Sequence, residues 1–252
     1  MPAPIALVTG ASRGLGRSMA VHLARAGVDL IGTYQRNAEE AAETARLVEG
    51  HGRRAAVLPL DVGRSDTFAA FAGAVREALG TTFGRDTFDF LVNNAGTGLH
   101  APVAETTEAQ FDALVAVHFK GPFFLTQHLL PLLADGGRVL NVSSGLARFT
   151  LPGAGAYAAC KGAVEVLTRY MAKEFGARGI TANVVAPGAI ATDFNGGRVR
   201  DDAQLNQFVA SNIPLGRVGE ADDVGAAVAS LLAGGMGWMN GVRVEVSGGQ
   251  NL

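Results

Sequence analysis

The stretch that decides the fold is Ile5-Ala-Leu-Val-Thr-Gly-Ala-Ser-Arg-Gly-Leu-Gly16. Its apolar opening predicts a short buried strand over 5–9, and a helical pattern of apolar residues follows its three glycines. Glycine lets the backbone turn sharply and approach a ligand, and a helix that starts beyond such a turn aims its first N–H groups at an anion. A glycine turn alone is often only structural. Between a strand and a helix, this one favours a nucleotide pyrophosphate.

Composition fits one α/β domain over residues 1–252. Apolar residues make up 48% of the chain and charged residues 17%, and glycine occurs 34 times, as in a sheet buried on both faces with many tight turns. The net charge of −2 offers no argument for nucleic acid or for a membrane surface. The lone Cys160 excludes an intrachain disulfide and fits a reducing compartment.

The sequence offers no targeting signal. The N-terminus, Met1-Pro-Ala-Pro4, lacks the pattern of a signal peptide, and no apolar run reaches membrane-spanning length. We therefore expect a soluble cytoplasmic protein.

Apolar runs alternate with helical patterns along the whole chain. Strands are expected over 5–9, 28–34, 55–62, 88–92, 139–144, 180–186 and 242–246. Helical segments are expected over 38–49, 66–79, 108–133, from 157 onward and over 221–232. This alternation predicts a parallel sheet of about seven strands with right-handed crossovers and helices on both faces.

The residues after the second strand bear on cofactor choice. In NAD-binding folds of this type an acidic residue there accepts the ribose hydroxyls, whereas arginine accommodates a 2′-phosphate. Here Gln35 and Arg36 stand at this place, and Arg13 lies in the glycine turn. Two guanidinium groups without a carboxylate favour NADP(H) over NAD(H). The alternative is that both arginines are merely solvated surface residues.

A candidate catalytic group lies between Asn141 and Lys161. Tyr157 and Lys161 are four residues apart and share one helix face, and Ser144 stands near the end of a strand. A nearby ammonium group favours the phenolate, so we expect Lys161 to lower the Tyr157 pKa. A phenol, its tuning lysine and an orienting hydroxyl suit hydride transfer to or from a carbonyl carbon. By itself, a tyrosine–lysine pair is more often just exposed helix surface.

Two further segments belong to the expected site. The fourth strand ends in Asn93-Asn-Ala-Gly96, at the edge where open α/β sheets bind ligands. The segment 193–214 is polar, glycine-rich and irregular, and we expect it to be a mobile lid over the substrate.

With these motifs in order, the chain closely resembles the short-chain dehydrogenase/reductase family over nearly its whole length. The resemblance implies a Rossmann fold in which Tyr157 is the acid/base, Lys161 binds the nicotinamide ribose and Ser144 steadies the substrate oxygen. It also implies a homotetramer. The cofactor-binding residues that it implies are Gly10, Ser12, Arg13, Gly14, Leu15, Gly16, Arg36, Asp61, Val62, Asn94, Ala95, Gly96, Tyr157, Lys161, Pro187, Gly188, Ile190 and Thr192.

The chain departs from the family at His118, where asparagine is usual and helps to hold a water that links the lysine to solvent. A neutral imidazole also has one donor and one acceptor, so His118 could hold the same water as a fourth catalytic residue. A neighbouring lysine should lower its pKa, and activity should fall on acidification through that pKa. The alternative is that His118 only fills space in a helix. The other histidines show no metal-ligand spacing, so no metal is expected.

These observations predict an NADP(H)-dependent oxidoreductase that reduces a ketone or aldehyde, or oxidises the secondary alcohol. The overall resemblance points towards 3-oxoacyl-acyl-carrier-protein reductases. Docking of an acidic carrier needs basic surface, however; Arg178 could contribute to it, but Ala134-Asp135 before the fifth strand supplies no positive charge. We therefore favour a small-molecule substrate. The rival is a catalytically silent cofactor-binding or regulatory protein on the same fold.

Overall fold

Seven parallel strands form one sheet in the computed structural model, which describes residues 2–252. The order across the sheet is β3-β2-β1-β4-β5-β6-β7, and every neighbouring pair is parallel. The strands are β1 (Ile5–Val8), β2 (Asp29–Tyr34), β3 (Ala55–Pro59), β4 (Phe88–Asn93), β5 (Leu133–Val142), β6 (Thr181–Pro187) and β7 (Arg243–Val246).

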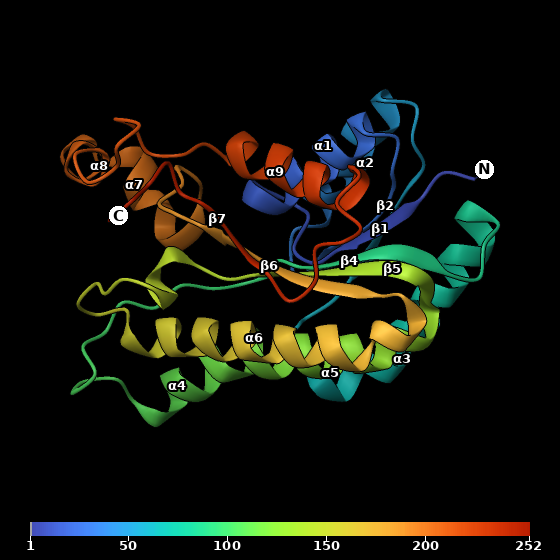
Figure 1. Ribbon diagram of the computed structural model, residues 1–252, viewed down its shortest axis with the longest axis horizontal. Helices are drawn as coiled ribbons and strands as arrows, with labels where there is room; N and C mark the ends of the chain where they lie inside the picture. Colours follow the sequence, from blue (N-terminus) through green and yellow to red (C-terminus); the bar gives the residue numbers. More distant parts are fainter. Residues whose placement is uncertain (1) are drawn as a thin grey trace.

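Helices cover both faces of this sheet. Figure 1 shows α1, α2 and α9 on one face, and α3, α4, α5 and α6 on the other. The helices are α1 (Gly14–Arg25), α2 (Ala38–Gly50), α3 (Phe68–Ala78), α4 (Glu108–Val115), α5 (Gly121–Leu129), α6 (Gly155–Glu174), α7 (Arg198–Asp201), α8 (Ala203–Ala210) and α9 (Ala221–Ala233). Short helical turns are η1 (Ser65–Thr67), η2 (Leu79–Phe83), η3 (Ala116–Lys120), η4 (Leu130–Leu132), η5 (Gly145–Ala147), η6 (Gly176–Arg178) and η7 (Phe194–Gly197).

Each face of the sheet has its own apolar core. Phe68, Phe88 and Leu129 belong to the cluster under α3 and α5, and Leu30 and Val228 belong to the cluster under α1 and α9. All four residues of β1 are buried, because this central strand has helices on both sides. The fold is therefore the predicted Rossmann-type doubly wound sheet.

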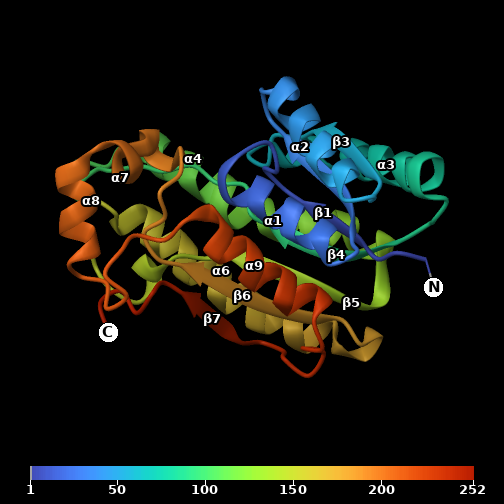
Figure 2. The ribbon, with the colours of Figure 1, turned by 90° about the horizontal axis from the view of Figure 1, so that it is seen from above.

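The strand order reverses at β1, whose neighbours are β2 and β4. The connections that follow β1 and β4 run to opposite faces of the sheet. The crevice between these two connections lies at the carboxyl ends of the strands. The glycine turn over 9–13 joins the end of β1 to the start of α1, which lies next to this strand in the view from above (Figure 2). This edge is where the sequence places the candidate site.

A buried amide network joins the central strands to the helices beneath them. Asn93 on β4 donates to Asn141 Oδ1 on β5 at 2.8 Å and to Thr126 Oγ1 on α5 at 3.1 Å. Asn141 in turn donates to Thr168 Oγ1 on α6 at 2.8 Å. All four side chains are buried, so these bonds fix β4 and β5 against α5 and α6.

Two segments differ most from their predicted structure. The expected irregular lid over 193–214 instead holds η7, α7 and α8, and Asp202 caps α8 by accepting from the N–H groups of Gln204 and Leu205. The helical segment expected over 108–133 is divided by the π-helical turn η3 and ends earlier, because β5 begins at Leu133. Within residues 2–252, no helix has both the length and the hydropathy of a membrane span.

Candidate active site

The three predicted catalytic side chains meet at the carboxyl end of β5. Ser144 is the second residue beyond this strand and caps η5, where its Oγ accepts from the N–H of Leu146 at 3.2 Å. Tyr157 and Lys161 lie one turn apart on α6. The Lys161 Nζ donates to the carbonyl of Val142 at 2.7 Å, which ties the helix to the end of the strand.

The environment of Tyr157 keeps its phenol protonated. Burial raises the pKa of Tyr157 to about 12, and the neighbouring Ser144 hydroxyl acts in the opposite direction without cancelling this effect. The prediction that the Tyr157 pKa lies below its ordinary value is therefore wrong. The Lys161 Nζ is held by Val142 and lies 5.6 Å from the centre of the Tyr157 ring. Desolvation of the phenolate outweighs any help from the ammonium group.

Lys161 is itself shifted by its surroundings. The residue is only 5% exposed, and burial lowers its pKa to about 8, against a smaller opposite effect of Cys160. Near neutral pH the lysine is therefore mostly charged, although it loses its proton far more easily than an exposed lysine. This makes Lys161 suitable for passing a proton to or from the site.

His118 lies in the same cluster, and its pKa is lowered, as the sequence predicted. The residue is 2% exposed, in the π-helical turn η3. Its Nε2 lies 2.7 Å from the carbonyl of Thr97 and 3.3 Å from the N–H of Thr97, whereas its Nδ1 is buried without a partner. Burial first, and the charge of Lys161 second, lower the His118 pKa to about 3. The imidazole is therefore neutral at ordinary pH.

The glycine turn has the form that the sequence predicts. Gly10 and Gly14 have positive φ angles, of 66° and 54°. A Cβ on Gly16 would lie 2.1 Å from the carbonyl oxygen of Gly10, so no side chain fits there. Helix α1 starts at Gly14 with no side-chain cap and no acidic residue in its first turn. Its first N–H groups are thus left to bind an anion, which fits a pyrophosphate.

The predicted amide motif holds this turn in place. Asn94 Nδ2 donates to the carbonyl of Thr9 at 2.8 Å, and the Thr9 hydroxyl accepts from the N–H groups of Asn94 and Ala95. The motif predicted at 93–96 therefore divides: Asn93 belongs to the buried network, and Asn94 supports the glycine turn.

The remaining predicted cofactor residues lie around the same edge. Asp61 accepts from the N–H of Gly63 at 2.9 Å, in a turn beyond β3, which ends three residues short of the predicted strand. Gly188 follows β6, and a Cβ there would clash with Ser247 and with the Gln250 side chain. Other predicted cofactor residues occupy the loops and ends of these same elements: Ser12, Leu15, Val62, Gly96, Pro187, Ile190 and Thr192.

The two predicted phosphate-binding arginines are differently placed. The Arg13 side chain is 65% exposed, and its Nη1 lies 3.9 Å from an oxygen of Asp193. Arg36 is exposed, two residues beyond β2. The glycine turn and β2 are directly bonded, because the N–H of Ala11 donates to the carbonyl of Thr33 at 2.8 Å. Both arginines therefore lie next to the place where the glycine turn contacts the end of β2.

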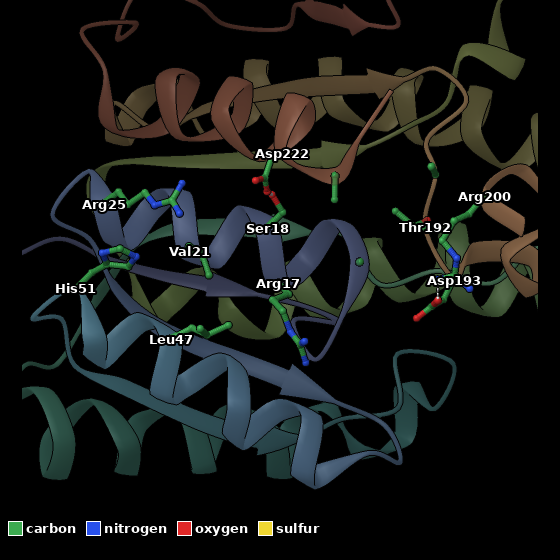
Figure 3. A pocket seen from close by; sticks show the side chains of 13 residues that line it. Arg17, Ser18, Val21, Arg25, Leu47, His51, Thr192, Asp193, Arg200 and Asp222 are labelled. Carbon is green, nitrogen blue, oxygen red and sulfur yellow. Dashed lines mark hydrogen bonds and ion pairs between the residues drawn. The ribbon is translucent and has the colours of Figure 1, made fainter. Parts of the chain in front are cut away.

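A cavity of about 460 Å³ opens beside α1 (Figure 3). Side chains from α1, α2, the start of α9 and the segment after β6 surround it, including Arg17, Leu47, Asp193 and Asp222. It reaches Gly14 and Thr192 but none of Ser144, Tyr157 and Lys161. The cavity is thus next to the pyrophosphate end of the site and away from the catalytic hydroxyl groups.

An apolar ring borders the catalytic tyrosine. The ring of Phe194, from η7, lies 6.1 Å from the Tyr157 ring at a tilt of 52° and is 47% exposed. Val103 is 81% exposed, and one of its methyl groups lies 3.0 Å from the place of a Cβ on Gly155, at the start of α6. Phe194 therefore offers a partly solvent-exposed aromatic surface beside the tyrosine, and Val103 adds an exposed apolar side chain at the start of the same helix.

Sequence reasoning missed several supporting residues. Arg17 donates to the carbonyl of Ser12 and pairs with Glu40, so its side chain ties the glycine turn to helix α2. Gln250 accepts from the N–H of Ala189 at 2.8 Å. Glu40 lies 23 residues from Arg17 and Ala189 lies 61 from Gln250, and no local pattern indicates such pairs.

Comparisons with known proteins agree with this arrangement. The family model described as enoyl-(acyl carrier protein) reductase matches residues 10–251. A short-chain type dehydrogenase/reductase of Picea abies is 36% identical, with 98% of this chain and 92% of that protein covered.

Two solved structures are also similar over almost the whole chain. The reductase LugOII, which catalyses keto-reduction at C1 during lugdunomycin biosynthesis, matches with a TM-score of 0.94 and 38% identity over 100% of this chain and 99% of that one. The angucycline C-6 ketoreductase LanV with bound NADP matches with a TM-score of 0.93 and 34% identity over 98% and 95%. The chain therefore belongs to the short-chain dehydrogenase/reductase family.

Proposed function

We propose that this protein is an NADP(H)-dependent reductase of ketones or aldehydes that can also oxidise the corresponding secondary alcohol. The observation that carries the proposal is the placement of the Tyr157 phenol beside the Ser144 hydroxyl, with the buried Lys161 one turn further along α6 and its Nζ 5.6 Å from the tyrosine ring centre. A neutral phenol is the form that can give a proton to a carbonyl oxygen.

Each catalytic residue has a distinct task in this proposal. NADPH, when bound, supplies the hydride that the carbonyl carbon receives. The Ser144 hydroxyl donates a hydrogen bond that orients the substrate oxygen, and Tyr157 transfers its proton to that oxygen. Lys161 stabilises the tyrosinate that this transfer leaves, because its ammonium group lies on the same helix face. Proton return to Tyr157 then completes the cycle.

The choice of NADP(H) rests on charge. Arg13 and Arg36 leave the junction of the glycine turn and β2, and the residue after β2 is Gln35 rather than an acid. A guanidinium group pairs well with a phosphate dianion, and the position directly after β2 lacks the acid that would accept ribose hydroxyls. The bound NADP of the similar ketoreductase LanV supports the same choice.

For the substrate, we propose a cyclic aromatic ketone. Phe194 places a half-exposed aromatic ring beside Tyr157, which suits a flat apolar molecule. The keto-reductions named for LugOII and LanV support this class. A carrier-bound acyl chain is disfavoured, because Arg178 pairs with Asp135 at 2.6 Å near the start of β5, at the end of that strand away from Ser144.

A substrate screen tests the proposal. A bicyclic aryl ketone, an open-chain ketone and a 3-oxoacyl thioester are each offered with NADPH and with NADH. The highest kcat/KM is expected for the aryl ketone with NADPH. Binding of NADPH without turnover of any carbonyl compound or alcohol would instead support the silent cofactor-binding alternative.

A further inference from the structure

An alternating row of two arginines and two glutamates lies behind the catalytic serine. We name it the Arg243 cluster, and its members are Arg148, Glu245, Arg243 and Glu165. They come from the segment after β5, from β7 and from α6. Their side chains are only 16% to 36% exposed, so the row is sheltered from solvent over most of its length.

Arg243 divides its guanidinium group among three partners. Its Nε donates to Glu165 Oε1 at 2.8 Å and its Nη1 donates to Glu245 Oε2 at 2.9 Å. Its Nη2 donates to the main-chain carbonyl of Ser144 at 3.2 Å. One planar, rigid group therefore fixes the peptide of the catalytic serine relative to β7 and α6.

Glu165 connects this row to the catalytic helix. It follows Lys161 by four residues and Tyr157 by eight, so the three side chains share one face of α6. The Glu165 Oε1 also accepts from the hydroxyl of Ser143 at 2.5 Å. The carboxylate thus ties α6 to the residue directly before Ser144.

Arg148 connects the other end of the row to the nicotinamide side of the site. It pairs with Glu245 at 3.0 Å and donates to the carbonyl groups of Gln250 and Asn251 at 2.9 and 3.1 Å. The Gln250 side chain holds the N–H of Ala189, in the segment after β6. Although burial opposes it, hydrogen bonds from Arg148 and Arg243 lower the Glu245 pKa, which keeps this carboxylate charged.

We propose that Arg243 is a positioning residue that sets the orientation of Ser144 towards Tyr157 through the carbonyl of Ser144. The inference rests on the proposed reductase function. Ser144 has an extended backbone, with φ −158° and ψ 152°, and its carbonyl oxygen accepts from Arg243 Nη2 at 3.2 Å and from the N–H of Ala147 at 3.1 Å. Loss of the Arg243 bond leaves the carbonyl with the Ala147 N–H alone, so the peptide can tilt and shift the hydroxyl that orients the substrate. Displacement of such a group by ~1 Å can cost up to ~10²-fold in rate.

The test separates charge from geometry. Arg243→Lys keeps the positive charge between the two glutamates but cannot reach three partners with one planar fork. We expect it to fold, to bind NADPH within about twofold of wild type and to lose at least ~10-fold in kcat. Glu165→Gln keeps the carbonyl acceptor for Arg243 and Ser143 and should keep kcat within about threefold.

Arg85→Met is the matched control. Arg85 is similarly sheltered and pairs with Asp89 at 2.7 Å near the start of β4, the end of that strand away from the site. This variant should lose stability and keep the wild-type kcat at temperatures where it is folded. A folded Arg243→Lys variant with wild-type kcat overturns the proposal.

Crystal structures provide a readout that does not depend on turnover. The Ser144 carbonyl of Arg243→Lys is expected to move by more than about 0.5 Å from its place in the wild type. An unmoved Ser144 peptide refutes the positioning role even if the wild type proves inactive. Wild-type inactivity on every carbonyl compound, by contrast, refutes the proposed reductase function alone.

Discussion

The imidazole of His118 meets the ring of Tyr157 edge to face, with the ring centres 5.1 Å apart and the planes at 84°. Such contacts stabilise both rings beyond simple burial. The neutral His118 therefore packs against the ring of the catalytic tyrosine. Its unpartnered Nδ1 remains able to accept a hydrogen bond from a water. This geometry is compatible with both readings from the sequence, the water relay and the packing role.

His118 should make the fold sensitive to acid. Its pKa is about 3 in the folded protein, against an ordinary value of 6.5, so between these values the unfolded chain binds the extra proton. Its contribution to stability is then complete above pH 6.5 and declines as the pH falls towards 3. At pH 5 the loss is about 2 kcal/mol relative to neutral pH.

The measurement is Tm from pH 4 to 8 for wild type and His118→Asn. The variant should lose less stability on acidification, whatever its Tm at pH 8. Parallel curves for the two proteins would contradict the low His118 pKa. The same low pKa moves any acid limb of activity that depends on His118 to about pH 3, below the range of ordinary assays.

His118→Leu tests the relay directly. Leucine fills similar space but has no acceptor, so turnover should fall well below that of His118→Asn if a water at Nδ1 carries protons to Lys161. Equal turnover of wild type and His118→Leu would leave the packing role as the explanation. Steady-state kcat at pH 7, with NADPH affinity as the control, decides between these outcomes.

Tyr157→Phe removes the hydroxyl and keeps the ring that packs on His118 and Phe194. Turnover should fall by at least ~10²-fold, the scale of general acid catalysis. NADPH binding, measured by fluorescence, should change little because Lys161 remains. Near-normal turnover would mean that another group donates the proton.

Arg36→Asp should weaken the preference for NADP(H) by roughly tenfold or more, because a charge-assisted pair to phosphate contributes about 1.5–3 kcal/mol. The ratio of kcat/KM for NADPH and NADH measures this preference. Arg64→Asp, at an exposed ion pair with Asp66, is the control and should leave the ratio unchanged. Equal efficiency of the wild type with both cofactors would refute the assignment.

Gly16→Ala should weaken NADPH binding by more than ~10-fold, since its Cβ would lie 2.1 Å from Gly10 O and 2.7 Å from Asn94 Nδ2 and the turn must shift. Gly80→Ala is the matched control, because its Cβ would have no neighbour within 4 Å. This change should stabilise the helical turn η2 slightly, by ~0.4–1 kcal/mol. Equilibrium titration and thermal melting separate the two effects.

The sequence predicts the sheet, its helices and the meeting of Ser144, Tyr157 and Lys161, because these depend on local patterns and on strand order. It does not predict the Tyr157 pKa, since the balance between desolvation and a nearby charge depends on where the Lys161 Nζ points. The Arg243 cluster is also beyond local patterns, because Arg148 and Glu245 are 97 residues apart. The homotetramer, the cytoplasmic location and the mobility of the lid stay predictions.

The amide pair of Asn93 and Asn141 has a consequence for changes in chain length. Between Phe88 and Phe90 the register of β4 against β5 shifts, so that β5 absorbs extra residues around Gly136. From there to the paired asparagines the register is regular. A one-residue shift of β5 against β4 at the paired asparagines would bury unpaired amide groups, at a cost of ~1–3 kcal/mol each. Insertions in β5 should therefore be tolerated near Gly136 and disruptive near Asn141.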